Sequence, residues 1–214
     1  MPEAQTRGMA AAGRLTRTTE EILAEVQQLP AELIHWVPAD GVWTVMDNLC
    51  HIREFVPFWT GETLRIVQRR PEPWGRDHTD TARLAAMTNT STHRLADVVA
   101  DIREAVRRST DTLRALSDEQ LAVEAASRNP RWGVKPASFV VEDLLVHHVA
   151  KHQGQIRRNV ALSLIFRQTP GWTDHRALLP IQRDAQHVSG RGAARNVPPV
   201  RAGPHVRRRE PRLL

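Results

Sequence analysis

The sequence has little of what marks several common classes of protein. Among its 214 residues it has a single cysteine, Cys50, and no tyrosine. One cysteine excludes an internal disulfide framework and fits a reducing compartment, so we expect a cytoplasmic protein. No run of apolar residues approaches the ~18 that would predict a membrane-spanning helix. The N-terminal segment also lacks the apolar stretch of a secretory signal.

Most of the chain also lacks an excess of charge of either sign. The formal net charge is +6, yet residues 1–166 carry 20 basic and 21 acidic side chains. Residues 167–214 carry 10 basic and 3 acidic side chains together with 6 prolines. We therefore expect a basic, Arg/Pro-rich disordered tail at 167–214, and a disordered N-terminus at 1–12. The near-neutral body argues against nucleic acid as a partner.

Helical periodicity is the main pattern that is present. Hydrophobic residues at helical spacing predict amphipathic helices at about residues 13–29, 44–68, 92–116 and 137–166. No segment has convincing strand alternation. The second helix opens with a capping box at Thr44-Val-Met-Asp47. Four helices of this length predict an all-α protein whose residues 13–166 form a four-helix bundle.

Histidines on two of these helices are candidate metal ligands. At about 100° per residue, His148 and His152 lie within about 40° of the centre of the apolar arc of the last helix, whereas His147 lies outside it. His51 lies at the flank of the apolar arc of the second helix. Hydrogen bonding to other core groups would satisfy the buried pair. A shared metal is the other interpretation, because three imidazoles plus solvent make an open coordination site.

Two motifs about 100 residues apart resemble a known family. The stretch Trp43-Thr-Val-Met-Asp-Asn-Leu-Cys-His51 resembles the "W-[ST]-V-x-[DE]-x-L-x-H" motif of the DinB superfamily, the DinB/YfiT-like metalloenzymes. The stretch His148-Val-Ala-Lys-His152-Gln-Gly-Gln-Ile156 resembles its "H-x-x-x-H-x-G-Q-I" motif, with Gln153 where many members have Arg. Over about residues 13–166, the resemblance implies a bundle of DinB/YfiT-like type. It also implies a divalent ion held by His51, His148 and His152, and imidazole ligation suits Zn, Ni, Fe and Cu alike.

The resemblance also implies a class of reaction. Several members of the superfamily are thiol-dependent transferases or isomerases that use low-molecular-weight thiols. We therefore expect a metal-dependent S-transferase that joins a thiol, such as mycothiol, to a small electrophilic substrate. Hydrolysis by metal-bound hydroxide is the close variant, and a non-catalytic, stress-associated metal-binding module is the alternative.

Other partners are less well supported by the sequence. A nucleic-acid role would have to work through the tail, and we expect no membrane partner. Homodimers are common in the family, but no exposed apolar stripe in the sequence establishes one here.

Polar and aromatic residues near the histidines each have two interpretations. Asp47 lies one turn before His51 and either orients an imidazole or only caps the helix. Glu62 faces either the pocket or solvent, and Gln155 braces the helix packing near the site. Two phenylalanines wall an apolar pocket or belong simply to the core, namely Phe55 and Phe58.

Overall fold

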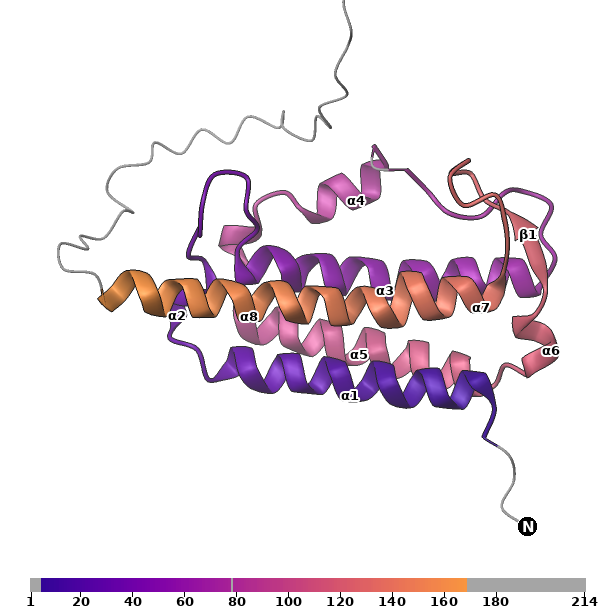
Figure 1. The fold of residues 1–214 in the computed structure, drawn as a ribbon, viewed down its shortest axis with the longest axis horizontal. Helices are drawn as coiled ribbons and strands as arrows, with labels where there is room; N and C mark the ends of the chain where they lie inside the picture. Colours follow the sequence, from indigo (N-terminus) through magenta and orange to yellow (C-terminus); the bar gives the residue numbers. More distant parts are fainter. Residues whose placement is uncertain (1–4, 78, 169–214) are drawn as a thin grey trace, which may run out of the picture. The chain divides into compact units, whose positions relative to one another are not determined.

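The structure, a computed structural model, describes residues 5–77 and 79–168 and has four long helical segments. They are α1 (Arg7–Gln27), α3 (Val45–Val67), α5 (Leu95–Arg114) and a last segment made of α7 (Ala137–Phe139), η2 (Val140–Val146) and α8 (His147–Gln168). Figure 1 shows them running side by side. This confirms the predicted all-α four-helix bundle. The tail at 167–214 falls almost wholly outside the described residues.

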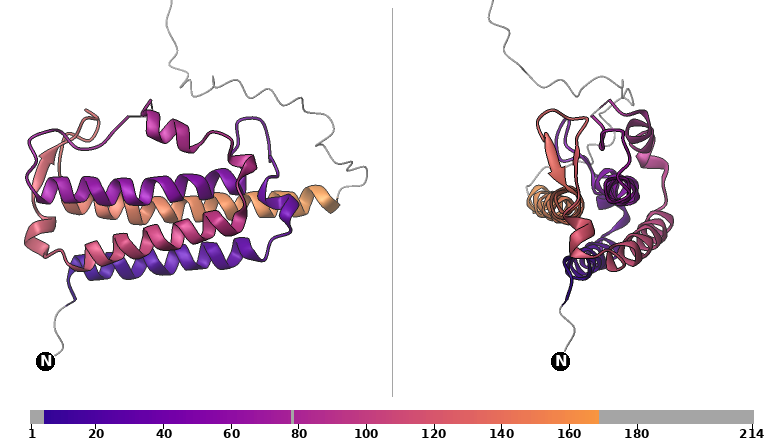
Figure 2. Two further views of the ribbon diagram at one scale, coloured as in Figure 1. Left: turned by 180° about the vertical axis from the view of Figure 1, so that it is seen from behind. Right: turned by 90° about the vertical axis from the view of Figure 1, so that its right-hand side faces the viewer.

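The order of the helices around the bundle differs from their order in the chain. Helix α1 packs on α5, α5 packs on α3, and the last segment packs on both α3 and α1. The end-on view in Figure 2 shows the same arrangement. The second and last long helices are therefore neighbours. This neighbourhood allows one side chain of α3 to meet side chains of α8.

Helix α1 begins earlier than the sequence predicted. It starts at Arg7, where the Thr6 hydroxyl accepts a hydrogen bond from the Met9 backbone N–H. The expectation of disorder at 1–12 is therefore wrong for residues 7–12. The apolar face starts with small residues, Ala11 and Ala12, which are fully buried. Gly8 lies close to α5, because a Cβ at this position would be 2.2 Å from the backbone oxygen of Leu113.

Helix α3 opens as predicted. The Thr44 hydroxyl accepts from the Asp47 backbone N–H at 3.0 Å, and the Asp47 carboxylate accepts from the Thr44 backbone N–H at 2.9 Å. This capping box satisfies two of the helix's free N–H groups. It fixes the start of α3 one turn before His51.

The last helix contains a π-helical segment that periodicity did not predict. Residues Val140–Val146 form η2, and regular α-helix begins at His147. π-Helical turns are rare and occur often at functional sites. Because His148 and His152 both lie after η2, their spacing of one α-helical turn is intact. The predicted helical wheel, which assumes 100° per residue, is therefore inaccurate only for the residues before His147.

The connections between the long helices contain short elements. Helix α2 (Ala31–Ile34) lies between α1 and α3, and α4 (Thr81–Ala86) and η1 (Thr90–Thr92) lie between α3 and α5. Helix α6 (Asp118–Leu121) and two strands lie between α5 and α7. Strands β1 (Glu124–Ala126) and β2 (Val134–Pro136) pair antiparallel, with Ala125 opposite Lys135. Strands of three residues are too short to show alternation, so the sequence did not reveal them.

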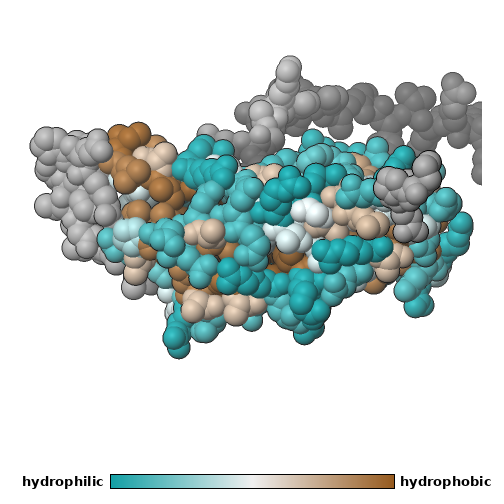
Figure 3. Space-filling view, turned by 90° about the horizontal axis from the view of Figure 1, so that it is seen from below, coloured by the Kyte–Doolittle hydropathy of each residue, from teal (hydrophilic) through white to brown (hydrophobic). Residues whose placement is uncertain are grey.

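The surface is mostly polar. In Figure 3 most of the visible face is hydrophilic, with apolar side chains gathered towards one end. Exposed large apolar side chains of α8 are Leu162, Leu164 and Ile165. Within residues 5–77 and 79–168, no helix is both long enough and apolar enough to cross a membrane.

Candidate metal centre

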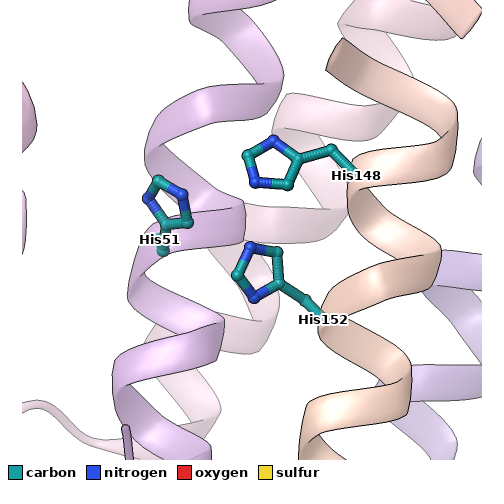
Figure 4. Close-up of side chains that lie close together, drawn as sticks. All are labelled: His51, His148 and His152. Carbon is teal, nitrogen blue, oxygen red and sulfur yellow. The ribbon is translucent and has the colours of Figure 1, made fainter. Parts of the chain in front are cut away.

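The structure brings the three predicted histidines together. His51 comes from α3, and His148 and His152 come from successive turns of α8. One ring nitrogen from each lies within 4.8 Å of the others. Figure 4 shows the rings of the two helices directed towards one another. His51 therefore shares one site with two histidines that lie 97 and 101 residues later in the sequence.

Aromatic rings hold two of the imidazoles in place. Trp43 stacks on His152, with ring centroids 5.8 Å apart and an interplanar angle of 10°. Phe55 stacks on His148 at 4.1 Å and 17°. Phe55 is fully buried, so it is both core and a wall of the site. Phe58 lies elsewhere, beneath the guanidinium of Arg76 at 3.8 Å.

Asn48 fixes the tautomer of His152. Its amide nitrogen donates to the Thr44 carbonyl at 2.8 Å, which directs its oxygen towards His152 Nδ1, also at 2.8 Å. An amide oxygen only accepts hydrogen bonds, so Nδ1 of the neutral ring must carry the proton. The lone pair is then on Nε2, which is buried without a hydrogen-bond partner among the described residues. A hydrogen bond of this kind commonly orients a metal-bound histidine.

The carboxylate nearest to His51 is that of Glu54, which already accepts hydrogen bonds from Arg76. The Nδ1 of His51 is buried without a hydrogen-bond partner among the described residues, and Glu54 Oε2 lies 3.9 Å away. Both carboxylate oxygens of Glu54 accept from Arg76 at 2.6 Å. Two ring nitrogens of the cluster, His51 Nδ1 and His152 Nε2, are thus buried and unsatisfied. Buried ring nitrogens without a hydrogen-bond partner fit a cluster that could hold a metal ion.

Burial keeps all three imidazoles neutral at physiological pH. It lowers the pKa of His51 to about 2, helped by the neighbouring His152 and His148 rings. It lowers the pKa of His148 to about 4. Burial and the His148 ring lower the pKa of His152 to about 3. A metal ligand must be the neutral ring, so no proton has to leave these groups at pH 7.

The adjacent His147 behaves as the helical wheel predicted. Its side chain is 61% exposed, and its Nδ1 lies 3.6 Å from Asp143 on the solvent side. His148 lies inside, among the stacked rings. The two neighbours are therefore clearly separated by the geometry of α8.

The polar residues singled out near the site have structural roles. Asp47 caps α3 and also accepts a hydrogen bond from the Thr90 hydroxyl, so it bonds no imidazole. Glu62 accepts from the Gly75 backbone N–H at 2.5 Å and fastens the loop that follows α3. Cys50 is fully buried, and burial raises the pKa of its thiol to about 11. This thiol stays protonated and is no nucleophile at neutral pH.

The histidines open onto a pocket of about 530 Å³. This volume is within the range of small-molecule sites. Gln155 lines the pocket, together with residues that the sequence did not point to: Val42, Asn48, Arg83, Arg158, Asn159 and Leu162. Asn48 carried a weak signal, because it lies one turn before His51 on the inner face of α3. Arg83 carried none, because its position depends on the fold of the 69–91 connection.

Two solved structures share the fold of this chain. The YfiT protein of Bacillus subtilis, described as a probable metal-dependent hydrolase with an unusual four-helix bundle topology, has a TM-score of 0.60 at 15% identity. The match covers 79% of this chain and 94% of YfiT. A mutant of the mycothiol-dependent maleylpyruvate isomerase has a TM-score of 0.55 at 15% identity, over 69% of this chain and 59% of the isomerase. At this identity the likeness concerns the fold alone.

Sequence comparison identifies the family. No curated protein matches the chain. The family model of the DinB superfamily matches residues 14–156, which include α3, the histidine cluster and the start of α8. The chain therefore belongs to the DinB superfamily.

Proposed function

We propose that this protein is a metal-dependent enzyme that transfers a low-molecular-weight thiol to a small electrophile. His51, His148 and His152 would hold one divalent ion. The observation that carries the proposal is the convergence of three neutral imidazoles, two with orphaned buried nitrogens, on the floor of a pocket. The fold is shared with a mycothiol-dependent isomerase, which adds support for a thiol co-substrate.

A divalent ion bound by three neutral ligands keeps its full charge and would deprotonate a coordinated thiol or acidify a coordinated water. The chain's own residues would do the rest. Asn48 holds the proton on His152 Nδ1, and the stacked Trp43 and Phe55 rings keep two imidazoles from turning. In the transfer, the sulfur would give its electron pair to carbon, while the leaving group departs with the electrons of the broken bond. The thiol proton would pass to solvent.

The lining of the pocket favours thiol transfer over hydrolysis. Among the lining residues that lie within 5–77 and 79–168, none is an aspartate or glutamate. A water nucleophile commonly uses a carboxylate or a free histidine as its base, whereas a thiol that binds the ion would be deprotonated on coordination and would release its proton to solvent. Low-molecular-weight thiols are kept reduced in the cytoplasm, so the proposal places the enzyme there.

The first experiment is elemental analysis of protein purified without a polyhistidine tag. We expect close to one divalent ion per chain, and the element found names the metal among Zn, Ni, Fe and Cu. His148→Ala should weaken retention at least about tenfold, while the exposed neighbour change His147→Ala should leave it unaltered. Full occupancy in the His148→Ala protein at limiting metal would refute the assignment.

The second experiment separates the functions. The metal-loaded protein is incubated with a panel of thiols and small electrophiles, and thiol consumption is measured. Metal-dependent consumption supports the transferase. Product formation without thiol indicates the hydrolase, and metal binding with no turnover indicates a non-catalytic metal-binding module.

A further inference from the structure

The three histidines differ in the acceptors that their ring N–H groups have. A histidine that binds a metal through one ring nitrogen carries its proton on the other, and this N–H is normally given to an acceptor. His152 Nδ1 has the Asn48 amide oxygen at 2.8 Å, and the backbone of Leu144 offers an acceptor to His148. His51 Nδ1 is buried without a hydrogen-bond partner among the described residues. An acceptor for His51 is therefore the part of the centre still to be identified.

The carboxylate of Glu54 lies beside this nitrogen. Glu54 follows His51 by about one turn of α3, and its Oε2 lies 3.9 Å from His51 Nδ1. Both side chains are largely buried, with 6% of His51 and 13% of Glu54 exposed. A hydrogen bond needs a distance about 1 Å shorter, so the two groups are adjacent without being bonded. A small turn of the imidazole would join them.

Arg76 fixes the carboxylate in this position. Its guanidinium donates to both oxygens of Glu54 at 2.6 Å and to Asp80 at 3.2 Å, and it lies over the Phe58 ring at 3.8 Å. A paired contact of this kind is strong and directional, so Glu54 has little freedom to turn away. Arg76 uses one lone pair on each oxygen, and Oε2 can therefore accept a second hydrogen bond.

A hydrogen bond to Glu54 would determine the tautomer of His51, as Asn48 determines that of His152. An ionised carboxylate only accepts hydrogen bonds, so a neutral imidazole bonded to it carries its proton on Nδ1. The lone pair of His51 is then on Nε2 and is available to a metal ion. The negative charge of the partner also makes that nitrogen a more basic ligand.

We propose that Glu54 is a positioning residue of the metal centre, which accepts a hydrogen bond from His51 Nδ1 when an ion is bound, and that Arg76 holds Glu54 in place. This role rests on the proposed metal site and is independent of the transfer reaction. It also couples the centre to the 69–91 connection, because Arg76 belongs to that connection while Glu54 and His51 belong to α3.

The same helix supplies a matched control in Glu62. Its side chain is 11% exposed, close to the 13% of Glu54. It accepts from the Gly75 backbone N–H at 2.5 Å, so the two glutamates fasten successive residues of one connection to α3. The hydrogen bond and the ion pair of Glu62, with Gly75 and Arg65, involve no histidine. Only Glu54 combines the fastening with a place beside an imidazole.

The test compares Co²⁺ binding by the full-length unaltered protein, Glu54→Gln and Glu62→Gln. Affinity is measured by chelator competition at pH 7.5, and the visible absorption of the bound Co²⁺ reports how its ligands are arranged. In Glu54→Gln an N–H₂ group that cannot accept replaces one carboxylate oxygen, and Arg76 takes the other. We expect this protein to bind Co²⁺ about 10–100-fold more weakly and with a changed spectrum. Glu62→Gln should lower the unfolding free energy and leave affinity and spectrum unaltered.

Unchanged Co²⁺ affinity and spectrum in Glu54→Gln would overturn the role of Glu54. An equal loss of affinity in Glu54→Gln and Glu62→Gln would overturn it too, because both would then act by fastening the connection. If Glu54→Gln fails to fold, Arg76→Lys decides, since it keeps the positive charge but loses the paired contact. Weaker binding with a changed spectrum in Arg76→Lys supports the role, and unaltered binding refutes it.

Failure of this role can be told apart from failure of the proposed function. If the unaltered protein binds no Co²⁺, the metal centre and the role of Glu54 are wrong together. Metal binding that depends on Glu54, without thiol turnover, removes the transferase alone. Thiol turnover with the same metal affinity in Glu54→Gln and the unaltered protein removes only the role of Glu54.

Discussion

Replacing Asn48 tests whether the histidine cluster is built for a metal. Asn48 is fully buried and makes two hydrogen bonds, one to the Thr44 carbonyl and one from His152 Nδ1. Asn48→Ala would leave that carbonyl and the imidazole N–H unpaired. Each buried unpaired group costs about 1–3 kcal/mol, so we expect a loss of unfolding free energy of this order.

Metal affinity should fall separately from stability. Without the amide, nothing holds the proton on His152 Nδ1, so the ring can take the other tautomer, in which Nε2 carries the proton and has no lone pair for a metal. Loss of such an orienting partner typically weakens metal binding by about 10–100-fold, which is about 1.4–2.8 kcal/mol. The affinity is measured at pH 7.5 by competition with a chromophoric chelator. Unfolding of the metal-free protein is followed in parallel.

Two further variants make the result interpretable. Asn48→Asp keeps an acceptor for His152 Nδ1, loses the donor to Thr44 and adds a buried carboxylate, so metal affinity should be largely restored while stability stays reduced. Thr63→Val removes another buried hydrogen bond of α3, to the Trp59 carbonyl at 2.9 Å, and should lower stability alone. If Asn48→Ala loses stability but binds metal as tightly as the unaltered protein, the amide is only structural and the tautomer argument fails.

Three other predictions follow from burial and packing. The pKa values of His51, His148 and His152 are lowered to about 2, 4 and 3, whereas unfolded histidine titrates near 6.5. The unfolded state therefore takes up more protons below pH 6.5. The metal-free protein should lose about 1 kcal/mol per histidine for each pH unit between 6.5 and 5. Denaturant titrations across that range that give a flat profile would contradict this. Gly8→Ala should lower the melting temperature because its Cβ meets the Leu113 oxygen, while Gly13→Ala, with open space around it, should raise stability by about 0.5–1 kcal/mol. Equal melting temperatures for the two variants would refute the close-approach argument. Deleting residues 169–214 should leave metal stoichiometry unchanged, because the three histidines and their described contacts lie within 5–168. Loss of metal in that truncated protein would show otherwise.

The sequence predicted those features of the structure that depend only on residues close together in the chain. The relation of His148 to His152 is set by one turn of α-helix, and the wheel also separated His148 from the exposed His147. The capping box of α3 needs only four consecutive residues, and it was predicted correctly. The start of α1 was missed because periodicity counts large aliphatic residues, whereas this helix end packs through Gly8, Ala11 and Ala12.

The rest of the site depends on tertiary structure. The packing of α3 beside α8 follows from the order of helices in the bundle, which no local pattern encodes. It decides that His51 faces the pair on α8, and that Asn48 rather than Asp47 bonds an imidazole. Asp47 was the natural candidate because a carboxylate often orients a metal ligand, but the helix cap and the Thr90 hydroxyl use both its oxygens.

The arginines that line the pocket show the same principle at longer range. Arg158 lies on a regular helix, and its direction follows from that of Gln155 one turn earlier. Arg83 lines the pocket from α4, in a connection that Arg76 ties to Glu54 on α3, at 2.6 Å and 22 residues away in the chain. A residue placed by such a contact has no signature of its own in the sequence. The pair of histidines on α8 could therefore be predicted from helical geometry, while the part of the pocket lining that comes from the 69–91 connection had to be found in the structure.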